Sequence, residues 1–184
     1  YACNVGINIA SSDVTPGTFA AIIGNVIHDQ AGQQPSDPYN GGAIVVRGGT
    51  NVFVVNNTLA NVDAGINMPP GTNAVTIQNN VITTSGNALY AEDSKTRIIS
   101  NNLFSANATF NGASSGTAAI FGNPLFVGTA DFHLQTTSPA IDAGVLSPVY
   151  AAFLSRYGVS IAMDAEANLR PAGAGWDLGA FEKR

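Results

Sequence analysis

Apolar and polar residues alternate in short stretches along the first two thirds of the chain, and the same order of stretches recurs. Within residues 42–106, two short alternating segments flank a pair of neighbouring asparagines in each repeat. The second asparagine of each pair stands at position 57, 80 or 102, so the repeat lengths are 23 and 22 residues. A fixed period of this length is typical of a solenoid, in which each unit stacks on the one before.

The alternation has a period of two, which predicts strands and not helices. Ile66 and Met68 are expected to face inward and Asn67 between them outward, and Tyr90 takes the outward place one repeat later. Stacking successive turns about 4.8 Å apart would align like residues in columns. The sequence therefore predicts an all-β fold, a parallel β-helix of about 22–23 residues per rung.

The asparagine pairs stand where one strand must bend into the next. Asparagine tolerates a left-handed backbone, and stacked side-chain amides can hydrogen-bond along the axis of the helix. Four asparagines are predicted to form this structural column: Asn25, Asn57, Asn80 and Asn102. With these features the chain resembles the right-handed parallel β-helix proteins of the pectate-lyase-like superfamily. That scaffold carries lyases, hydrolases, adhesins and structural proteins, so the resemblance implies a fold and not a function.

Residues 123–184 depart from the repeat. The segment begins Asn123-Pro124-Leu125-Phe126, contains Ser138-Pro139-Ala140-Ile141-Asp142 and Arg170-Pro171, and ends with Asp177-Leu178-Gly179-Ala180-Phe181-Glu182. It resembles the C-terminal end of bacterial surface-anchored β-helix repeat proteins, although Ala167 replaces the glycine expected before Arg170 and no anchor sequence follows. We expect rungs in residues 1–122 and a cap in residues 123–184, both within one structural domain.

The cap contains one predicted helix, residues 147–157. Ser147 suits the N-cap, Pro148 the first turn and Gly158 the stop. Its apolar face is expected to cover the open C-terminal rung; this face consists of Val149, Tyr150, Phe153, Leu154 and Tyr157. Arg170 is expected to lock the tail by pairing with one acidic residue, the candidates being Asp142, Asp164, Asp177 and Glu182.

The chain begins within a repeat, because Gly6-Ile7-Asn8-Ile9 already has the pattern of residues 65–68. A bare end of a β-solenoid exposes unpaired strand edges. We therefore expect either further rungs upstream or head-to-tail self-association through the open N-terminal rung. The first repeat also contains an inserted loop, residues 30–41, of the kind that often forms a binding side.

Composition narrows the class of partner. The 184 residues include 7 basic and 12 acidic side chains, a net charge of −5, and only 10% are charged. This balance argues against nucleic-acid binding. We expect no membrane span, because no run of 18 apolar residues occurs, and we expect no signal peptide. The single cysteine, Cys3, excludes an internal disulfide, so a secreted or cell-surface location rests on the resemblance alone.

Catalysis on this scaffold requires outward-facing charged groups on neighbouring rungs. A lyase needs a Lys or Arg base, often with calcium held by acids, and a hydrolase needs paired carboxylates. We expect one outward column of Asn8, Ile44, Asn67 and Tyr90, and a second of Ala10, Val46, Pro69 and Glu92. These columns contain a single carboxylate, so no catalytic residue is assigned. Lys95 and Arg97 fit a solvated turn better than half of a lyase site.

Two groups of residues are candidates for ligand contact. One surrounds the inserted loop and the other lies on the outer face of the strands; together they are His28, Asp37, Tyr39, Arg47, Asn67, Tyr90, Glu92 and Asp93. A structural role is expected for His133. No metal site or cofactor is expected, since the acidic spacing matches no known calcium loop. A calcium ion held by the acidic residues of the tail is the alternative interpretation of these carboxylates.

The sequence therefore predicts a non-catalytic extracellular scaffold or surface-assembly module that contacts polysaccharide. Two alternatives stay open. One is the C-terminal part of a polysaccharide lyase or glycosidase, and the other is a carbohydrate-binding module that uses Tyr39 and Tyr90 as stacking platforms.

Overall fold

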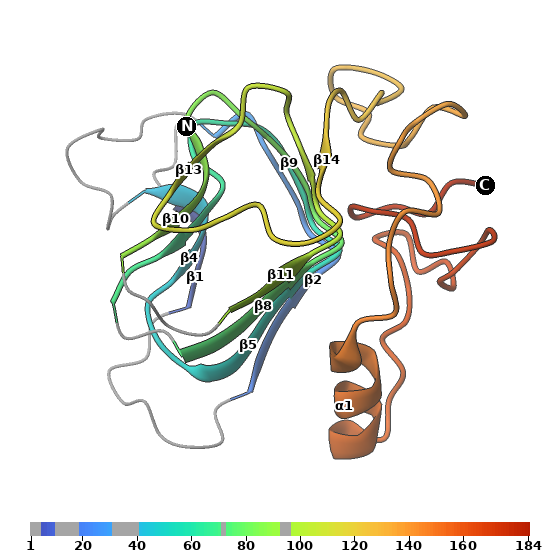
Figure 1. Cartoon of the computed structure of the whole chain (residues 1–184). Helices are drawn as coiled ribbons and strands as arrows, with labels where there is room; N and C mark the ends of the chain where they lie inside the picture. Colours follow the sequence, from blue (N-terminus) through green and yellow to red (C-terminus); the bar gives the residue numbers. More distant parts are fainter. Residues whose placement is uncertain (1–4, 10–18, 31–40, 71–72, 93–96) are drawn as a thin grey trace.

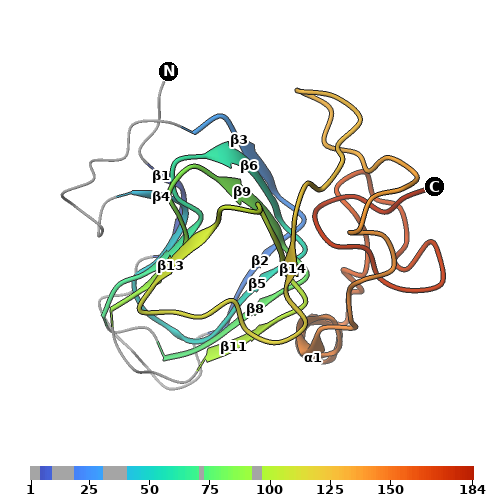
Figure 2. The same cartoon turned by 45° about the horizontal axis from the view of Figure 1, so that its top comes forward.

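The computed structural model describes residues 5–9, 19–30, 41–70, 73–92 and 97–184. Its strands form three sheets, and within each sheet all neighbouring strands are parallel (Figures 1 and 2). Sheet A is β1 (Val5–Ile9), β4 (Gly42–Val46), β7 (Ile66–Met68), β10 (Asn87–Ala91) and β13 (Thr109–Asn111). Sheet B is β2 (Ala20–Ile23), β5 (Thr50–Val55), β8 (Asn73–Gln78) and β11 (Arg97–Ser100). Sheet C is β3 (Val26–His28), β6 (Thr58–Val62), β9 (Val81–Thr84), β12 (Leu103–Phe104) and β14 (Ile120–Phe121).

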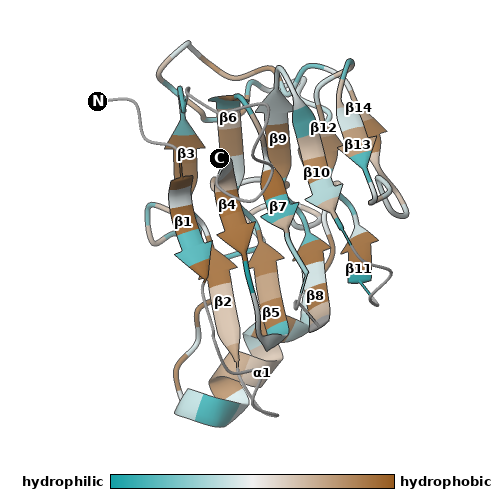
Figure 3. Cartoon of the chain, turned by 90° about the vertical axis from the view of Figure 1, so that its left-hand side faces the viewer, coloured by the Kyte–Doolittle hydropathy of each residue, from teal (hydrophilic) through white to brown (hydrophobic). Residues whose placement is uncertain are grey.

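Each of the first four rungs contributes one strand to each sheet, and the fifth contributes β13, β14 and, beside sheet B, a single bridge from Thr117 to Ser100. The predicted all-β parallel β-helix is therefore confirmed. Columns of aliphatic side chains fill the space between the three sheets. Figure 3 shows the corresponding apolar stretches as brown segments of the strands. Ile66 pairs with Ile44 on one side and with Leu89 on the other, and all three side chains are fully buried. Burying a side chain of this size stabilises the fold by about 1.5–3 kcal/mol.

The predicted outward column of sheet A was wrong at one rung. Asn8 pairs with Val45 and not with Ile44, and Val45 pairs with Asn67. Ile44 instead belongs to the buried core, as does Val46, which moves Arg47 into the outward place that was predicted for Val46. The cause is the run of apolar residues in β4, which hides the alternation that sets the register elsewhere.

The predicted asparagine ladder is confirmed. The side-chain amide of Asn25 donates to Oδ1 of Asn57 (2.9 Å), Asn57 donates to Asn80 (3.0 Å), and Asn80 donates to Asn102 (2.9 Å). Each of these Oδ1 atoms also accepts the backbone N–H of the preceding asparagine in the ladder. In the next rung Ala119 takes this place, since Ile120 pairs with Leu103, so the ladder ends at Asn102.

The first asparagine of each pair has a separate role that the sequence did not reveal. Asn56, Asn79 and Asn101 have φ angles of 54°, 58° and 52°, in the left-handed region that asparagine tolerates. Their side chains point away from the core and hydrogen-bond to the tail. Asn79 accepts from the backbone N–H of Val145 (3.0 Å) and donates to its carbonyl oxygen (2.6 Å), and Asn101 donates to the carbonyl of Ala143 (3.2 Å).

The tail lies along the side of the rungs, so the prediction that its helix covers the C-terminal rung was wrong. Helix α1 (Pro148–Tyr157) lies beside sheet B in Figures 1 and 2. Val149 and Tyr150 pack with Val55, and Phe153 contacts Phe19 with the ring centroids 6.3 Å apart. The outer face of sheet B is apolar in its first two rungs. An apolar surface of this kind is unfavourable in water, and the helix buries it.

The helix bounds were predicted correctly, and its buried face only in part. Ser147 is the N-cap but makes no side-chain capping bond, while Gly158 ends the helix with a φ of 70°. Leu154 and Tyr157 are 49% and 52% exposed, so they lie at the margin of the contact with sheet B. The described residues contain no helix with the length and apolar character that a membrane crossing requires.

Arg170 locks the tail as predicted, and its acidic partner is Glu182. Nη1 of Arg170 lies 2.7 Å from Oε1 of Glu182, and both side chains are fully buried. Arg170 also donates to the carbonyl oxygens of Met163 and Gly179. Asp177 accepts the backbone N–H of Asp142 (2.7 Å), and burial raises the pKa of the Asp177 carboxyl.

Candidate binding cleft beside sheet C

A β-hairpin of the tail stands beside the outer face of sheet C. Phe126 and Leu134 form an antiparallel bridge, and the backbone N–H of Val127 donates to the carbonyl of His133 (2.9 Å). On sheet C, Val26 and His28 face outward because Ile27 between them packs against the core. Three adjoining hollows form along this hairpin, and together we call them the tail cleft.

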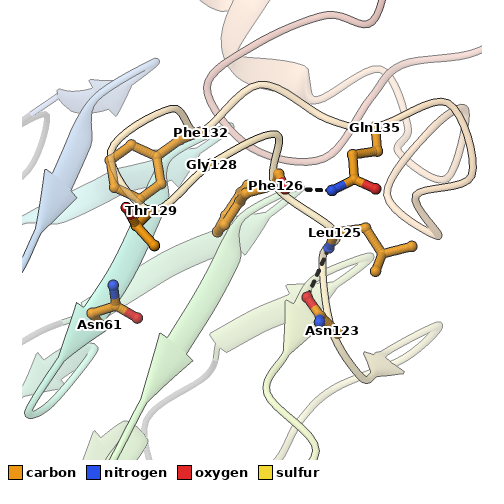
Figure 4. Close-up of a pocket in the computed structure, with 8 residues that line it drawn as sticks. All are labelled: Asn61, Asn123, Leu125, Phe126, Gly128, Thr129, Phe132 and Gln135. Carbon is orange, nitrogen blue, oxygen red and sulfur yellow. Dashed lines mark hydrogen bonds between the residues drawn. The ribbon is translucent and has the colours of Figure 1, made fainter.

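The first hollow has a volume of about 360 Å³ and is shown in Figure 4. Thr129 and Phe132 lie on the side of the hairpin that faces Asn61 of β6. The rings of Phe126 and Phe132 meet edge to face, with centroids 5.3 Å apart. No charged side chain lines this hollow; its residues are Asn61, Asn123, Leu125, Phe126, Gly128, Thr129, Phe132 and Gln135.

The second hollow has a volume of about 440 Å³ and shares Phe132 with the first. The ring of His28 lies 5.0 Å from that of Phe132, and Nδ1 of His28 lies 2.9 Å from Oδ2 of Asp29. This contact, with a hydrogen bond from Asn61, holds the pKa of Asp29 below its usual value. Asp131 and Phe181 complete the polar and aromatic walls.

The third hollow has a volume of about 240 Å³ and shares His133 with the second. Nδ1 of His133 lies 2.6 Å from Oδ1 of Asp131, Nε2 lies 3.4 Å from Oε1 of Glu166, and the ring stacks on Phe181 at 4.2 Å. The hydrogen bond to Asp131 is the main cause that raises the pKa of His133, and it lowers the pKa of Asp131.

This arrangement is suited to binding. Aromatic rings and amide or hydroxyl groups line an open cleft, and the shortest acid–base contact in it joins Nδ1 of His133 to Oδ1 of Asp131 (2.6 Å). Within the described ranges, no three His, Cys, Asp or Glu side chains group as a metal ion would require.

The structure places the sequence-predicted ligand residues in three different locations. His28 lies in the tail cleft, and Arg47 follows the far end of β4, so the two are not brought together. Tyr90 and Glu92 lie on the outer side of sheet A, where burial and the charge of Glu92 raise the pKa of Tyr90. Asn67 faces outward as expected, but its side chain is only 2% exposed and its amide donates to the carbonyl of Gly41. Asp37, Tyr39 and Asp93 lie outside the described residues.

Most residues of the cleft were not predicted from the sequence. Phe126, Phe132 and Phe181 belong to the tail motif, and Asn61 is the last residue but one of β6, an ordinary strand of the repeat. His133 was expected to be structural, and its contacts with Asp131 and Glu166 fit that role. The one signal available was the density of aromatic residues in the tail, since phenylalanines that leave a repeating core must pack elsewhere.

Comparison with known families agrees with the architecture. A family model described as "Right handed beta helix region" matches residues 2–129, which include the rungs and the first strand of the hairpin. Comparison with curated proteins finds no significant match.

Proposed function

The chain belongs to the right-handed β-helix family, and on that premise we propose that it is a non-catalytic extracellular scaffold module that holds polysaccharide in the tail cleft. The rungs supply a rigid support for the cleft, because each strand is hydrogen-bonded into a continuous sheet. The tail supplies the other wall, fixed to the rungs by Asn56, Asn79 and Asn101.

The observation that carries the proposal is the lining of the first hollow. Its polar groups are uncharged amides and a hydroxyl, and its apolar groups include two phenylalanine rings. A sugar ring presents hydroxyl groups at its edge and C–H groups on its faces, so it needs this combination of partners. A few placed polar groups on an aromatic wall are typical of sites for small organic ligands.

The outer faces of the rungs support a binding role over a hydrolytic one. Among the described residues, one outward column of sheet A consists of Asn8, Val45, Asn67, Tyr90 and Asn111, and the next one has a single carboxylate, Glu92. The outward column of sheet B that begins at Ala21 continues through Phe53, Thr76 and Ile98. Hydrolysis of a glycosidic bond requires two carboxylates on the same face, and these columns offer no such pair. A location outside the cell follows from the resemblance to surface proteins and is part of the proposal.

The test is a glycan-binding measurement on the whole chain, with neutral and acidic oligosaccharides as probes. Two substitutions alter the first hollow without removing core contacts. Asn61→Gly keeps the left-handed backbone at φ 55° and deletes the amide, and Thr129→Ala deletes an exposed hydroxyl. We expect both to weaken binding of a neutral oligosaccharide by at least about fivefold, which corresponds to about 1 kcal/mol.

Asn111→Ala is the matched control, because Asn111 is exposed on the outer face of sheet A, whereas the cleft lies beside sheet C. Binding that survives both cleft substitutions and is lost in Asn111→Ala or Tyr90→Ala would move the site to sheet A. Release of shortened glycan products by the purified chain would refute the non-catalytic assignment.

A further inference from the structure

His133 joins two parts of the tail that are far apart in sequence. It lies on the second strand of the hairpin, where Asp131 faces its Nδ1 at 2.6 Å. Glu166, from the segment after α1, faces its Nε2 at 3.4 Å. Its ring stacks on Phe181, near the end of the chain, with centroids 4.2 Å apart. One imidazole therefore connects the hairpin with two later segments and forms the wall between the second and third hollows.

The two contacts cannot both be hydrogen bonds when the imidazole is neutral. A neutral imidazole has one N–H donor, and a carboxylate is only an acceptor. Both ring nitrogens of His133 face carboxylate oxygens, so both contacts are attractive only when the imidazole is doubly protonated. Loss of one proton leaves one nitrogen lone pair directed at a carboxylate, which is repulsive.

We propose that His133 is a pH-sensitive latch of the tail cleft: the imidazolium holds the hairpin to the Glu166 segment, and deprotonation releases that contact and loosens the wall between the second and third hollows. The proposal concerns regulation of the cleft and rests on the proposed function only for the statement that the cleft holds a ligand. The raised pKa of His133 agrees with the geometry, since the carboxylates stabilise the charged form.

The other charged groups around His133 do not offset this effect. Across the second hollow stands His28, which is paired with Asp29. The third hollow is also lined by Lys183 and Arg184, and by Glu182, whose charge is matched by Arg170. Of the two contacts, the longer one to Glu166 is the one we expect to be lost, because Asp131 keeps the shorter bond and also accepts the backbone N–H of His133 (3.1 Å).

The test needs no ligand, so its failure and the failure of the glycan assay are distinguishable. Nuclear magnetic resonance would follow the titration of His133 together with hydrogen-exchange protection of the Val127 amide, which donates to the His133 carbonyl. We expect the protection of the Val127 amide, corrected for the intrinsic pH dependence of exchange, to fall by about tenfold as His133 loses its proton. A tenfold change corresponds to the same free energy as a shift of about one pKa unit.

Glu166→Gln is the decisive variant, because it keeps the size of an exposed side chain and removes its charge. It should lower the pKa of His133 and abolish the pH dependence of Val127 protection. His28→Gln, which alters the facing wall only, should leave both unchanged. Val127 protection that is equal on both sides of the titration, or a His133 pKa that does not respond to Glu166→Gln, would overturn the latch.

Discussion

Substitution of Asn80 by alanine would test whether the asparagine ladder stabilises the stack of rungs. The Asn80 side chain is fully buried in the third rung. It donates to the carbonyls of Val54 (2.9 Å) and Gln78 (3.0 Å) and to Oδ1 of Asn102 (2.9 Å). Its own Oδ1 accepts the backbone N–H and the side-chain amide of Asn57, at 2.9 Å and 3.0 Å.

The expected cost follows from which groups lose their partner. The amide of Asn57 keeps two carbonyl acceptors after the substitution, at Ile22 and Val55. Its buried backbone N–H loses the only partner identified for it, which costs about 1–3 kcal/mol. The four other side-chain bonds of Asn80 contribute about 0.5–1.5 kcal/mol each, so the lower ends of these ranges already bring the expected total to about 3 kcal/mol. That is a large part of an ordinary folding free energy of about 5–15 kcal/mol.

Asn25→Ala provides the matched control at the end of the same ladder. Asn25 is half-buried, and its amide donates to Oδ1 of Asn57 and to the carbonyl of Ile23. Oδ1 of Asn57 still accepts the backbone N–H of residue 25 after this change, so we expect a loss of about 1 kcal/mol. Urea unfolding followed by circular dichroism measures both values. A cost for Asn80→Ala no greater than that for Asn25→Ala would refute the reasoning.

Three further predictions concern the tail. Asn79→Gly keeps the left-handed backbone but deletes both hydrogen bonds to Val145, so limited proteolysis should remove the tail faster while the rungs persist. An unchanged rate of cleavage would contradict the role of Asn79 in fixing the tail to the rungs. Glu182→Gln leaves the buried charge of Arg170 unmatched and should lower the free energy of unfolding, measured in urea, by about 3 kcal/mol. A loss under about 1 kcal/mol would show that the backbone carbonyls of Met163 and Gly179 suffice to stabilise the buried Arg170. Because the pKa of His133 is raised on folding, its stabilising contribution is fully present below the ordinary value of 6.5 and is lost as pH rises through the folded value. His133→Gln should therefore flatten the decline in thermal stability above pH 6.5, and an equally steep decline in the variant would exclude His133 as its cause.

The rungs could be predicted because their stabilising interactions repeat. Each inward side chain packs on its equivalent one turn away, so the contact that fixes Ile66 also fixes Ile44 and Leu89, and the period is visible in the sequence. The ladder was predictable for the same reason, since Asn57 bonds to its own kind at Asn80. The register failed only in β4, where an apolar residue in every place removes the alternation on which the assignment depended.

The cleft and the position of the tail could not be predicted, because their contacts join residues that share no period. The amphipathic pattern of α1 showed that one face needed cover, and a bare rung end and the apolar side of sheet B satisfy that need equally well. Single contacts determine which of these surfaces the helix covers. One is the hydrogen bond that the hydroxyl of Tyr150 donates to Oδ1 of Asn56 (2.9 Å), two residues that lie 94 positions apart in the chain. The sequence nevertheless contained a clue. An asparagine ladder requires one asparagine per turn, and these rungs have two. The second asparagine of each pair completes the ladder, so the first was free to bind whatever segment lay against the outer corner, and in this chain that segment is the tail.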